Sequence, residues 1–577
     1  MAQALVSVDP FGHSEEGGGT GLRAAPSAEA CSPEARRFAR ALGVSVTAAD
    51  LLLRRGLGAV DEARRFLEPK LAHLTAPDGM VDRVVAARRL AKAVRDHERV
   101  CVFGDYDCDG ITAAAILTDV LRTLGGDVVS LIASRFEGGY GVSPEAVDRI
   151  VASGAKLLVT CDCGSSDHPT LAEVVARGID VIVIDHHLVP AEPLPAMAFL
   201  NPHRPDCGFP YKGLASCGLA FSVAAALRRE LDVALDLRGL LDLVAIGTIA
   251  DVAPLDGDNR ALVRAGLRQL ERSQRPGVVA LLEACELGSG VALSARDVAF
   301  RIAPRINAPG RLGSAELSLE LLLSRTVEQA RELAEAVERA SEERRALQQN
   351  MLAEALEEIE QQGYAARPAI VLGRPGWNHG IVGIVAGRLA DRFAKPAIVV
   401  GFDGARGRGS VRGPAGARLH DALRGCSEVL LRFGGHQAAA GVEVELGRLE
   451  ELRQRFERAC ERAPLGAPVE RPPVTLLDPE DDLLQVVKDL RAFEPCGEQN
   501  PAPKLGVQAK VALSREVRGG HLKLELELPG GRRLSAFGPS LGGRAASLGQ
   551  EVLVIGQLRP DRWRGGDAVE LGVEQIV

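Results

Sequence analysis

Short apolar runs alternate with amphipathic helical stretches from about residue 99 to about residue 320. Each run has the length of a β-strand, and this alternation is typical of βαβ units that build a parallel sheet. Strands that are buried on both faces of such a sheet consist almost wholly of apolar residues. We therefore expect a parallel sheet in this region. Four runs have this composition and are the predicted strands: Val100–Gly104, Leu157–Cys161, Val181–Ile184 and Leu243–Ala250.

Two other segments show helical patterns. Residues 36–97 have apolar positions at helical spacing, for example Leu51 to Leu53 and then Phe66 and Leu67. Residues 325–362 contain neither Gly nor Pro and are dense in Glu, Arg, Ala and Leu. This second segment favours one long helix of about 57 Å, at 1.5 Å per residue. An ordinary solvated helix and a connector between two domains both fit this pattern.

The C-terminal third has two further patterns. A second α/β pattern starts at Ala369 and runs to about residue 465, where a Pro-rich stretch marks a linker. Residues 521–528 then alternate polar and apolar side chains with period two, and another strand is expected at 551–555. Short strands joined by Gly-containing turns are typical of a small β-barrel such as an OB-fold.

Composition narrows the class of protein. A chain of 577 residues is too long for one hydrophobic core, so several domains are expected. The net charge of -8 is not that of a typical nucleic-acid binder, and any contact with DNA must come from a local basic groove. The 11 cysteines include no CxxC pair and are expected to be reduced thiols. We find no signal peptide and no run long enough to span a membrane, and we expect a cytoplasmic monomer.

Aspartates follow all four predicted strands. Ligands of a parallel sheet bind beyond the carboxyl ends of its strands, so these side chains should meet in one crevice. Bare carboxylates would repel one another there, and a divalent cation is the natural compensation. Carboxylates mixed with imidazoles suit Mn²⁺ or Mg²⁺, and two such ions can hydrolyse a phosphate ester. The segments concerned are Asp105-Tyr106-Asp107-Cys108-Asp109, Asp162, Asp185-His186-His187 and Asp251.

Each segment also has a simpler interpretation. The spacing of Asp105, Asp107 and Asp109 before Gly110 superficially matches a calcium loop, but position 12 would be Ile116, where such a loop needs Glu. A single Asp after a strand is more often a helix N-cap than a ligand, and a pair of histidines alone is a weak signal. Four such segments together favour a shared metal site.

These segments, in this order, resemble the motifs of the DHH phosphoesterase superfamily, which is named after its Asp-His-His tripeptide. More specifically, the chain is similar to the RecJ family. Residues 1–35 are rich in Gly, Ser, Ala and Glu and are expected to form a disordered tail. For the rest of the chain the resemblance implies an α/β multidomain fold with a parallel-sheet DHH domain with N-terminal helices at 36–320, a connecting helix at 321–365, an α/β DHHA1 domain at 366–465 and a C-terminal OB-fold β-barrel at 466–577. The segments that carry it, besides the four with aspartate, are Pro304–Arg311, Gly376–Gly380, Gly409–Arg412, Gly434–Gly441 and Pro495–Pro501.

The resemblance also implies roles for single residues. Asp162 would bridge two ions, His187 would face the scissile phosphate, and Asp185 would orient a neighbouring histidine. Asp105 is placed with these catalytic residues because it lies within the first motif. The expected metal ligands are Asp107, Asp109, Asp162, His186 and Asp251. The expected substrate-binding residues are Arg305, Asn307, Arg311, Ser410, Arg412 and His436.

The charge pattern of residues 401–435 agrees with this assignment independently. The segment is rich in Gly and holds six Arg against three acidic residues. A basic loop of this kind suits the approach of phosphate. A solvated surface loop is the alternative that the pattern alone leaves open.

Three functions are compatible with these features. The resemblance implies an exonuclease that degrades single-stranded DNA from the 5′ end, uses two Mn²⁺ or Mg²⁺ ions, releases mononucleotides and acts in recombination and repair. Its implied partners are single-stranded DNA, a helicase and a single-strand-binding protein. A different DHH hydrolase, acting on oligoribonucleotides, cyclic dinucleotides or pyrophosphate, is the second possibility. The third is a non-catalytic replication scaffold, which the complete set of aspartates and histidines disfavours.

Overall fold

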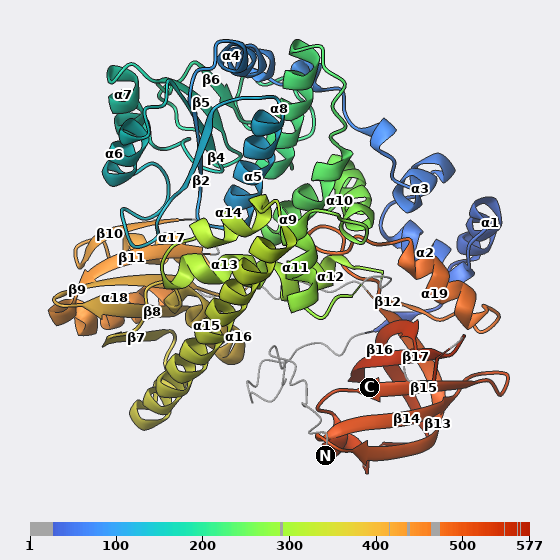
Figure 1. The fold of residues 1–577 in the computed structure, drawn as a ribbon. Helices are drawn as coiled ribbons and strands as arrows, with labels where there is room; N and C mark the ends of the chain where they lie inside the picture. Colours follow the sequence, from blue (N-terminus) through green and yellow to red (C-terminus); the bar gives the residue numbers. More distant parts are fainter. Residues whose placement is uncertain are drawn as a thin grey trace.

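The computed structural model describes residues 27–288, 292–414, 416–435, 439–462, 473–546, 548–561, 564–565 and 567–577. Three sheets organise these residues, and Figure 1 shows each with its covering helices. The predicted tail, 1–35, lies outside the described residues up to position 26. Its last part is ordered, since β1 (Ala28–Glu29) pairs with β12 (Val474–Leu476) and α1 begins at Pro33. The predicted linker at 463–473 falls almost wholly outside the described residues.

The first sheet is parallel, as predicted, with strand order β3-β2-β4-β5-β6. Every residue of β2 and β4 is buried, which explains why their sequences are apolar except for Thr160. The helices α4 (Arg83–Arg95), α5 and α8 cover one face, and α6 and α7 cover the other. The strands are β2 (Val100–Gly104), β3 (Val128–Ile132), β4 (Leu157–Cys161), β5 (Asp180–Ile184) and β6 (Ala198–Leu200), and the helices are α5 (Cys108–Thr123), α6 (Pro144–Ala152), α7 (His168–Ala176) and α8 (Ser216–Glu230).

The prediction of a fourth strand at Leu243–Ala250 is wrong. These residues form the helix α9 (Leu241–Ala250), nearly all of which is buried in the core beside α5 and α8. A helix buried on every side is apolar at every position, so its pattern cannot be told from that of a buried strand. The parallel sheet therefore ends at β6 and is followed by helices. These are α10 (Gly257–Leu270), α11 (Pro276–Ala284), α12 (Ala295–Asp297), the π-helical turn η4 (Val298–Ile302), α13 (Ala303–Leu312) and α14 (Glu316–Leu323).

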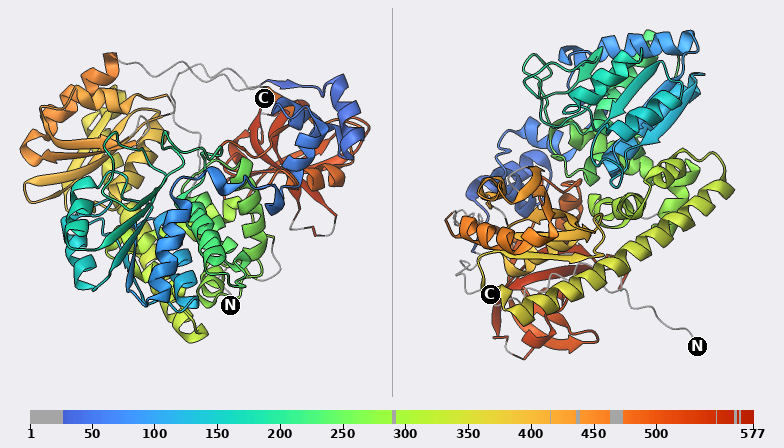
Figure 2. Two further views of the ribbon diagram at one scale, coloured as in Figure 1. Left: turned by 90° about the horizontal axis from the view of Figure 1, so that it is seen from above. Right: turned by 90° about the vertical axis from the view of Figure 1, so that its left-hand side faces the viewer.

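The long helix predicted for residues 325–362 is present as α15 (Val327–Gln362), with 36 residues. The side chain of Thr326 accepts a hydrogen bond at its start, and Gly363 in a left-handed conformation ends it. Its N-terminal part packs on α11, α13 and α14, and its C-terminal part packs on α16 (Val382–Phe393). Figure 2 shows how it joins the helical layer to the second sheet.

The second sheet has the order β10-β11-β9-β8-β7. The pair β7–β8 is parallel and the other pairs are antiparallel, so the second α/β pattern is confirmed as a mixed sheet. The helix α16 packs on one face of this sheet, and α17 (Leu419–Arg424) and α18 (Leu449–Arg462) pack on the other. The strands are β7 (Ile370–Pro375), β8 (Ala397–Asp403), β9 (Arg406–Arg412), β10 (Leu430–Gly435) and β11 (Ala439–Glu445).

The third sheet closes into a barrel, because β13 pairs with both β14 and β16. The helices α1 (Pro33–Leu42), α2 (Val46–Arg54) and α3 (Val60–Leu67) share the core of this barrel and α19 (Leu483–Arg491). These helices are predicted to belong with the parallel sheet, but they pack on the barrel instead; Figures 1 and 2 show them in blue beside the red barrel. Amphipathic periodicity shows that a helix packs, but not what it packs on. The barrel strands are β13 (Leu505–Val517), β14 (His521–Glu527), β15 (Arg533–Gly538), β16 (Glu551–Pro560) and β17 (Val569–Ile576).

Among the residues that the structure describes, no helix combines the length and the apolar character needed to cross a membrane.

Candidate active site

The loop between β2 and α5 carries three of the predicted aspartates. Asp107 is the N-cap of α5, and its Oδ1 accepts hydrogen bonds from the backbone N–H groups of Asp109 (3.0 Å) and Gly110 (3.1 Å). A Cβ on Gly110 would lie 2.6 Å from the backbone of Asp105, so only glycine allows the loop to turn this tightly. Asp107 is therefore an N-cap whose second carboxylate oxygen is left for another partner.

The N-terminus of α8 holds Asp109 and one further carboxylate, that of Asp162. The backbone N–H groups of Ser216 and Cys217 donate to Asp109 at 2.7 and 2.9 Å, where the helix dipole favours negative charge. The Ser216 hydroxyl donates to Oδ1 of Asp162 at 3.0 Å. Asp162 follows β4 with a left-handed φ of 64°, which turns its side chain toward Ser216. Sequence reasoning missed Ser216, because a single serine at a helix start has no distinctive pattern.

Asp185 follows β5, is fully buried and accepts several hydrogen bonds. It accepts hydrogen bonds from the backbone of Ser165 and His186 and from Nδ1 of His187 at 2.8 Å. Burial lowers the pKa of His187, but the hydrogen bond and charge of Asp185 outweigh it and raise that pKa to about 9. Burial opposes ionisation of Asp185, yet the bonds from His187 keep its pKa below the ordinary value. The pair is therefore an ionised carboxylate holding a protonated imidazole.

His186 differs from its neighbour. Its Nε2 lies 3.3 Å from Oδ1 of Asp162 and 3.7 Å from Oδ2 of Asp251, and it is buried without a hydrogen-bond partner among the described residues. Burial lowers the pKa of His186, which favours the neutral imidazole with a free lone pair. A neutral, oriented imidazole is the form that ligates metals.

Asp251 reaches the same crevice from the C-terminus of the helix α9, not from a strand. Burial, followed by the charges of Asp109 and Asp107, raises the pKa of Asp251 to about 9. The next residue, Val252, has φ +58° and a side chain that is 63% exposed. A β-branched residue rarely adopts this conformation, so the turn that delivers Asp251 is strained.

The donor set fits divalent cations. Burial, followed by mutual repulsion, raises the pKa of Asp105 and Asp162, and Oδ1 of Asp105 is buried without a hydrogen bond in the described part of the chain. A positive charge in the crevice would lower the repulsion between the carboxylates and would give the unpaired oxygen of Asp105 a partner. Mixed oxygen and imidazole donors suit Mn²⁺ and also Mg²⁺. The ligand atoms form three overlapping groups, each within 4.8 Å: Asp162, His186 and His187; Asp109, His186 and Asp251; and Asp105, Asp107 and Asp162.

Tyr140, from the loop between β3 and α6, borders this crevice. Its hydroxyl donates to the backbone oxygen of Asp162 at 3.0 Å and lies 3.0 Å from Nδ1 of His187. The two rings meet edge to face with centroids 5.4 Å apart. Tyr140 thus contacts the His187 imidazole both through its hydroxyl and through its ring. Sequence reasoning missed it, because it lies in an irregular loop.

Arginines from three elements lie beside the crevice. Arg135 stacks over the ring of Tyr106 at 3.9 Å, Arg311 comes from α13, and Arg412 ends β9. Burial, and then the charge of Arg135, lowers the pKa of both Arg311 (to about 10) and Arg412. Within the described residues, none of the three forms an ion pair with a carboxylate, so the cluster can accept an anion. Arg135 was not predicted, although it follows the edge strand β3.

The other predicted substrate residues are placed differently. The Ser410 hydroxyl lies beside Arg412, facing Gly383 of α16. Arg305 pairs with Glu338 of α15 at 2.5 Å and so joins α13 to the long helix. Oδ1 of Asn307 is buried and unpaired within the described chain. His436 lies outside the described residues.

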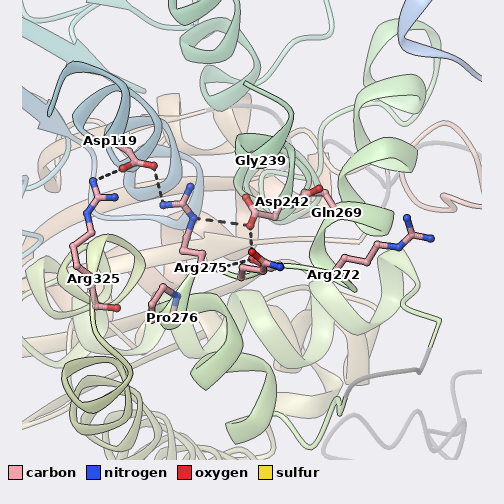
Figure 3. A pocket seen from close by; sticks show the side chains of 11 residues that line it. Asp119, Gly239, Asp242, Gln269, Arg272, Arg275, Pro276 and Arg325 are labelled. Atoms are coloured by element: carbon pink, nitrogen blue, oxygen red, sulfur yellow. Dashed lines mark hydrogen bonds and ion pairs between the residues drawn. The ribbon is translucent and has the colours of Figure 1, made fainter. Parts of the chain in front are cut away.

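A pocket of about 660 Å³ lies at the opposite ends of α5 and α9 from Asp109 and Asp251 (Figure 3). Here Arg275 stands between Asp119 of α5, at 3.0 Å, and Asp242 of α9, at 3.9 Å. Ser273 donates a further hydrogen bond to Asp242 at 2.8 Å. The network therefore ties together the two helices that deliver metal-ligand candidates.

Comparison with known proteins agrees with this arrangement. The model of the N-terminal domain of the DHH family matches residues 99–248, the DHHA1 domain model matches residues 365–462, and the RecJ OB domain model matches residues 475–575. The single-stranded-DNA-specific exonuclease RecJ of Dickeya dadantii is 37% identical over 526 residues, 85% of this chain and 89% of that protein. The chain belongs to the RecJ family. The RecJ protein of Bacillus subtilis is 33% identical over 92% of this chain and 68% of its own length.

Solved RecJ structures have the same fold. The crystal structure of RecJ from Thermus thermophilus in complex with Mn²⁺ matches with a TM-score of 0.81 and 34% identity, over 96% of this chain and 79% of that one. The complex of the same protein with Mg²⁺ matches with a TM-score of 0.75 and 32% identity, over 95% and 78% of the two chains. The DHH, DHHA1 and OB domains of the RecJ family thus correspond to the parallel-sheet unit, the mixed-sheet unit and the barrel.

Proposed function

We propose that the chain is a metal-dependent exonuclease that hydrolyses the phosphodiester bonds of single-stranded DNA. One observation carries the proposal: a crevice of carboxylates and imidazoles lies beside three arginines without carboxylate partners among the described residues. Cation sites next to an anion site are what a phosphodiester needs. Relatives in this family are named single-stranded-DNA-specific exonucleases, and the RecJ protein of Thermus thermophilus has been solved in complex with Mn²⁺ and in complex with Mg²⁺.

The residues of the crevice have different roles in the proposed hydrolysis. Bound cations supply a water molecule of lowered pKa and neutralise charge on the phosphate. Asp107, Asp109, Asp162, His186 and Asp251 would hold two ions, with Asp162 shared between them, as its place in two of the three ligand groups supports. We assign Asp105, whose free Oδ1 faces the same crevice, to the catalytic set.

Protonated His187 acts on the phosphate directly. Asp185 fixes the ring of His187, and the positive charge of the His187 imidazolium would stabilise the negative charge that grows on the phosphate oxygens. Arg135, Arg311 and Arg412, with Ser410, would bind the phosphate oxygens on the side of the mixed sheet. We assign Asn307 to the same path on the basis of its free buried oxygen. Arg305 and His436 are retained as substrate residues on the family motif alone.

We further propose 5′ to 3′ polarity, release of 5′-mononucleotides and a role in DNA recombination and repair. The barrel would hold the strand away from the cut by backbone and stacking contacts, as OB-folds do. An enzyme that takes only single strands depends on strand separation, so we propose a helicase and a single-strand-binding protein as partners. A cytoplasmic location and a monomeric state belong to the same proposal.

End-labelled DNA tests the function. Single-stranded and double-stranded oligonucleotides labelled at the 5′ or 3′ end are incubated with the full chain and Mn²⁺, Mg²⁺ or EDTA. We expect mononucleotides from the 5′ end of single strands, with a divalent cation only, and none from Asp162→Ala. Cleavage of oligoribonucleotides or cyclic dinucleotides alone would favour another DHH hydrolase. Tight DNA binding without hydrolysis under all conditions would favour a scaffold.

A further inference from the structure

The segment Phe493–Asn500 lies between the barrel and the helix that follows Asp251 (Figure 1). It contains most of the Pro495–Pro501 motif, to which the proposed function gives no role. Phe493 is fully buried in the core that the barrel shares with α1–α3. The side-chain amide of Asn500 donates to the carbonyls of Phe493 (2.9 Å) and Pro495 (2.6 Å), and its backbone exchanges two hydrogen bonds with Gly497. The segment is thus a closed loop fixed to the barrel.

Arg260 of α10 holds this loop from the other side. Its side chain is buried, and it donates to five backbone carbonyls at 2.9–3.2 Å: those of Phe66, Ala492, Phe493, Glu494 and Pro495. Its guanidinium also lies 3.8 Å from the centre of the Phe66 ring. An arginine has five N–H groups in a planar fork, so every one of them has an acceptor here. No other side chain could reproduce this set of contacts.

The loop then reaches the turn that delivers Asp251. The backbone N–H of Leu255 donates to the carbonyl of Glu498 at 2.9 Å. Gly497 packs against Leu255 so closely that a Cβ would lie 2.7 Å from Leu255 Cδ1. Leu255 is buried, and only three residues separate it from Asp251, among them the strained Val252. The turn is therefore fixed by α9 at one end and by the loop at the other.

We propose that the loop Phe493–Asn500 positions Asp251 for cation binding, with Arg260 and Gly497 as its positioning residues. The barrel unit then supports the metal centre as well as binding DNA. A strained turn relaxes once one of its ends is released, and the Asp251 carboxylate would leave the position that it shares with Asp109 and His186. The inference rests on the proposed metal centre, but it concerns a binding constant that does not require hydrolysis.

Mn²⁺ titration calorimetry on the full chain tests this positioning role. Arg260→Lys keeps the positive charge but loses most of the five hydrogen bonds. Gly497→Val adds a side chain that clashes with Leu255 and displaces it. We expect each variant to weaken Mn²⁺ binding at least tenfold, toward the level of Asp251→Asn. Arg532→Lys is the matched arginine control, because Arg532 also donates to two carbonyls, of Asp481 and Pro479, but has no link to Leu255. Gly543→Val is the matched glycine control, since a Cβ there meets nothing within 4 Å. Both controls should stay within twofold of the parent.

The outcomes separate this inference from the proposed function. Folded Arg260→Lys and Gly497→Val proteins that bind Mn²⁺ within twofold of the parent, while Asp251→Asn does not, would overturn the positioning role. Should Arg260→Lys fail to fold, Gly497→Val decides alone. Weakened Mn²⁺ binding in both variants supports the role even if the parent degrades no DNA, which would refute the nuclease proposal only. Unchanged binding in Asp251→Asn as well would overturn both.

Discussion

Nδ1 of His187 lies 2.8 Å from Oδ1 of Asp185, and this hydrogen bond sets the charge of the imidazole that faces the crevice. The carboxylate is fully buried and accepts three backbone N–H groups besides the imidazole. It therefore cannot turn away, and the ring of His187 is held in one orientation with Nδ1 protonated. The paired charges explain why a half-buried histidine has a pKa of about 9.

Asp185→Asn is expected to remove this charge. An amide has no net charge to stabilise the imidazolium, so the pKa of His187 should fall toward or below 6.5. DNA hydrolysis at pH 8 should drop about 10- to 100-fold, the worth of one charge-assisted hydrogen bond. The loss should be smaller at pH 6, where His187 regains its proton. The measurement is kcat against pH for both proteins, and an equal loss at every pH would contradict this assignment.

The metal-free protein should lose stability as pH rises from 6.5 to 8.5. The pKa values of Asp251 and His187 are both about 9 in the folded chain and lie above their unfolded values of 3.8 and 6.5. Groups with raised pKa values stabilise the fold below the unfolded pKa, and this contribution fades as pH rises to the folded pKa. We expect a loss of roughly 1–3 kcal/mol over this window, because two groups titrate together.

Thermal unfolding in EDTA at the two pH values measures this loss. Added Mn²⁺ should restore stability mainly at pH 8.5, since the cation takes the place of the protons. Asp251→Asn should flatten the dependence on pH. A metal-free protein that is equally stable at both values would show that the carboxylates do not interact as the geometry indicates.

The part of the site that the sequence predicted is the part encoded locally. Asp107, Asp162 and Asp185 each follow a run of apolar residues that is buried from end to end. Asp251 lies beside Asp109 and His186, but the apolar run before it is a helix and not the predicted strand, and the C-terminus of that helix points into the same crevice. Periodicity carries no signal in a segment that is buried on all sides.

Residues that act across long sequence separations could not be predicted. Ser216 bonds to Asp162, 54 positions away, and Tyr140 bonds to His187, 47 positions away. Each is a single polar residue without a periodic pattern around it. The same holds for Arg260, whose partners lie in α3 and in the loop after α19. Their roles depend on how the units pack, which a local pattern does not specify.

Arg135→Met tests the arginine cluster. Arg135 reaches the crevice from the loop after β3 and has no carboxylate partner in the described chain. If it binds a phosphate oxygen, its removal should lower kcat/KM on single-stranded DNA about 10- to 100-fold, as expected for a hydrogen bond to a charged group. Arg331→Met, on the exposed face of α15, is the control and should stay within twofold. Equal activities of parent and Arg135→Met would exclude Arg135 from the phosphate path.

Arg275→Met tests the pocket of Figure 3. Burial raises the pKa of Asp242, and the charge of Arg275 opposes this. Removing the guanidinium leaves a buried carboxylate that keeps its hydrogen bonds from Ser273 and from the backbone N–H of Leu243 but has lost its cation. Asp119 keeps its ion pair with Arg325 at 2.5 Å, so this carboxylate should contribute little to the loss of stability. We expect the free energy of unfolding to fall by about 1–3 kcal/mol, the cost of leaving a buried polar group poorly satisfied. Denaturant titration measures this loss as unfolding at a lower denaturant concentration.

Arg272→Met is the matched control in the same pocket. Arg272 is exposed and forms no ion pair with any carboxylate that the structure describes, so its loss should change stability by less than about 0.5 kcal/mol. Because α5 and α9 carry Asp109 and Asp251 at their other ends, Arg275→Met should also weaken Mn²⁺ binding, and Arg272→Met should not. A stability loss in Arg275→Met with unchanged Mn²⁺ affinity would mean that the network stabilises the fold but does not set the spacing of the ligands.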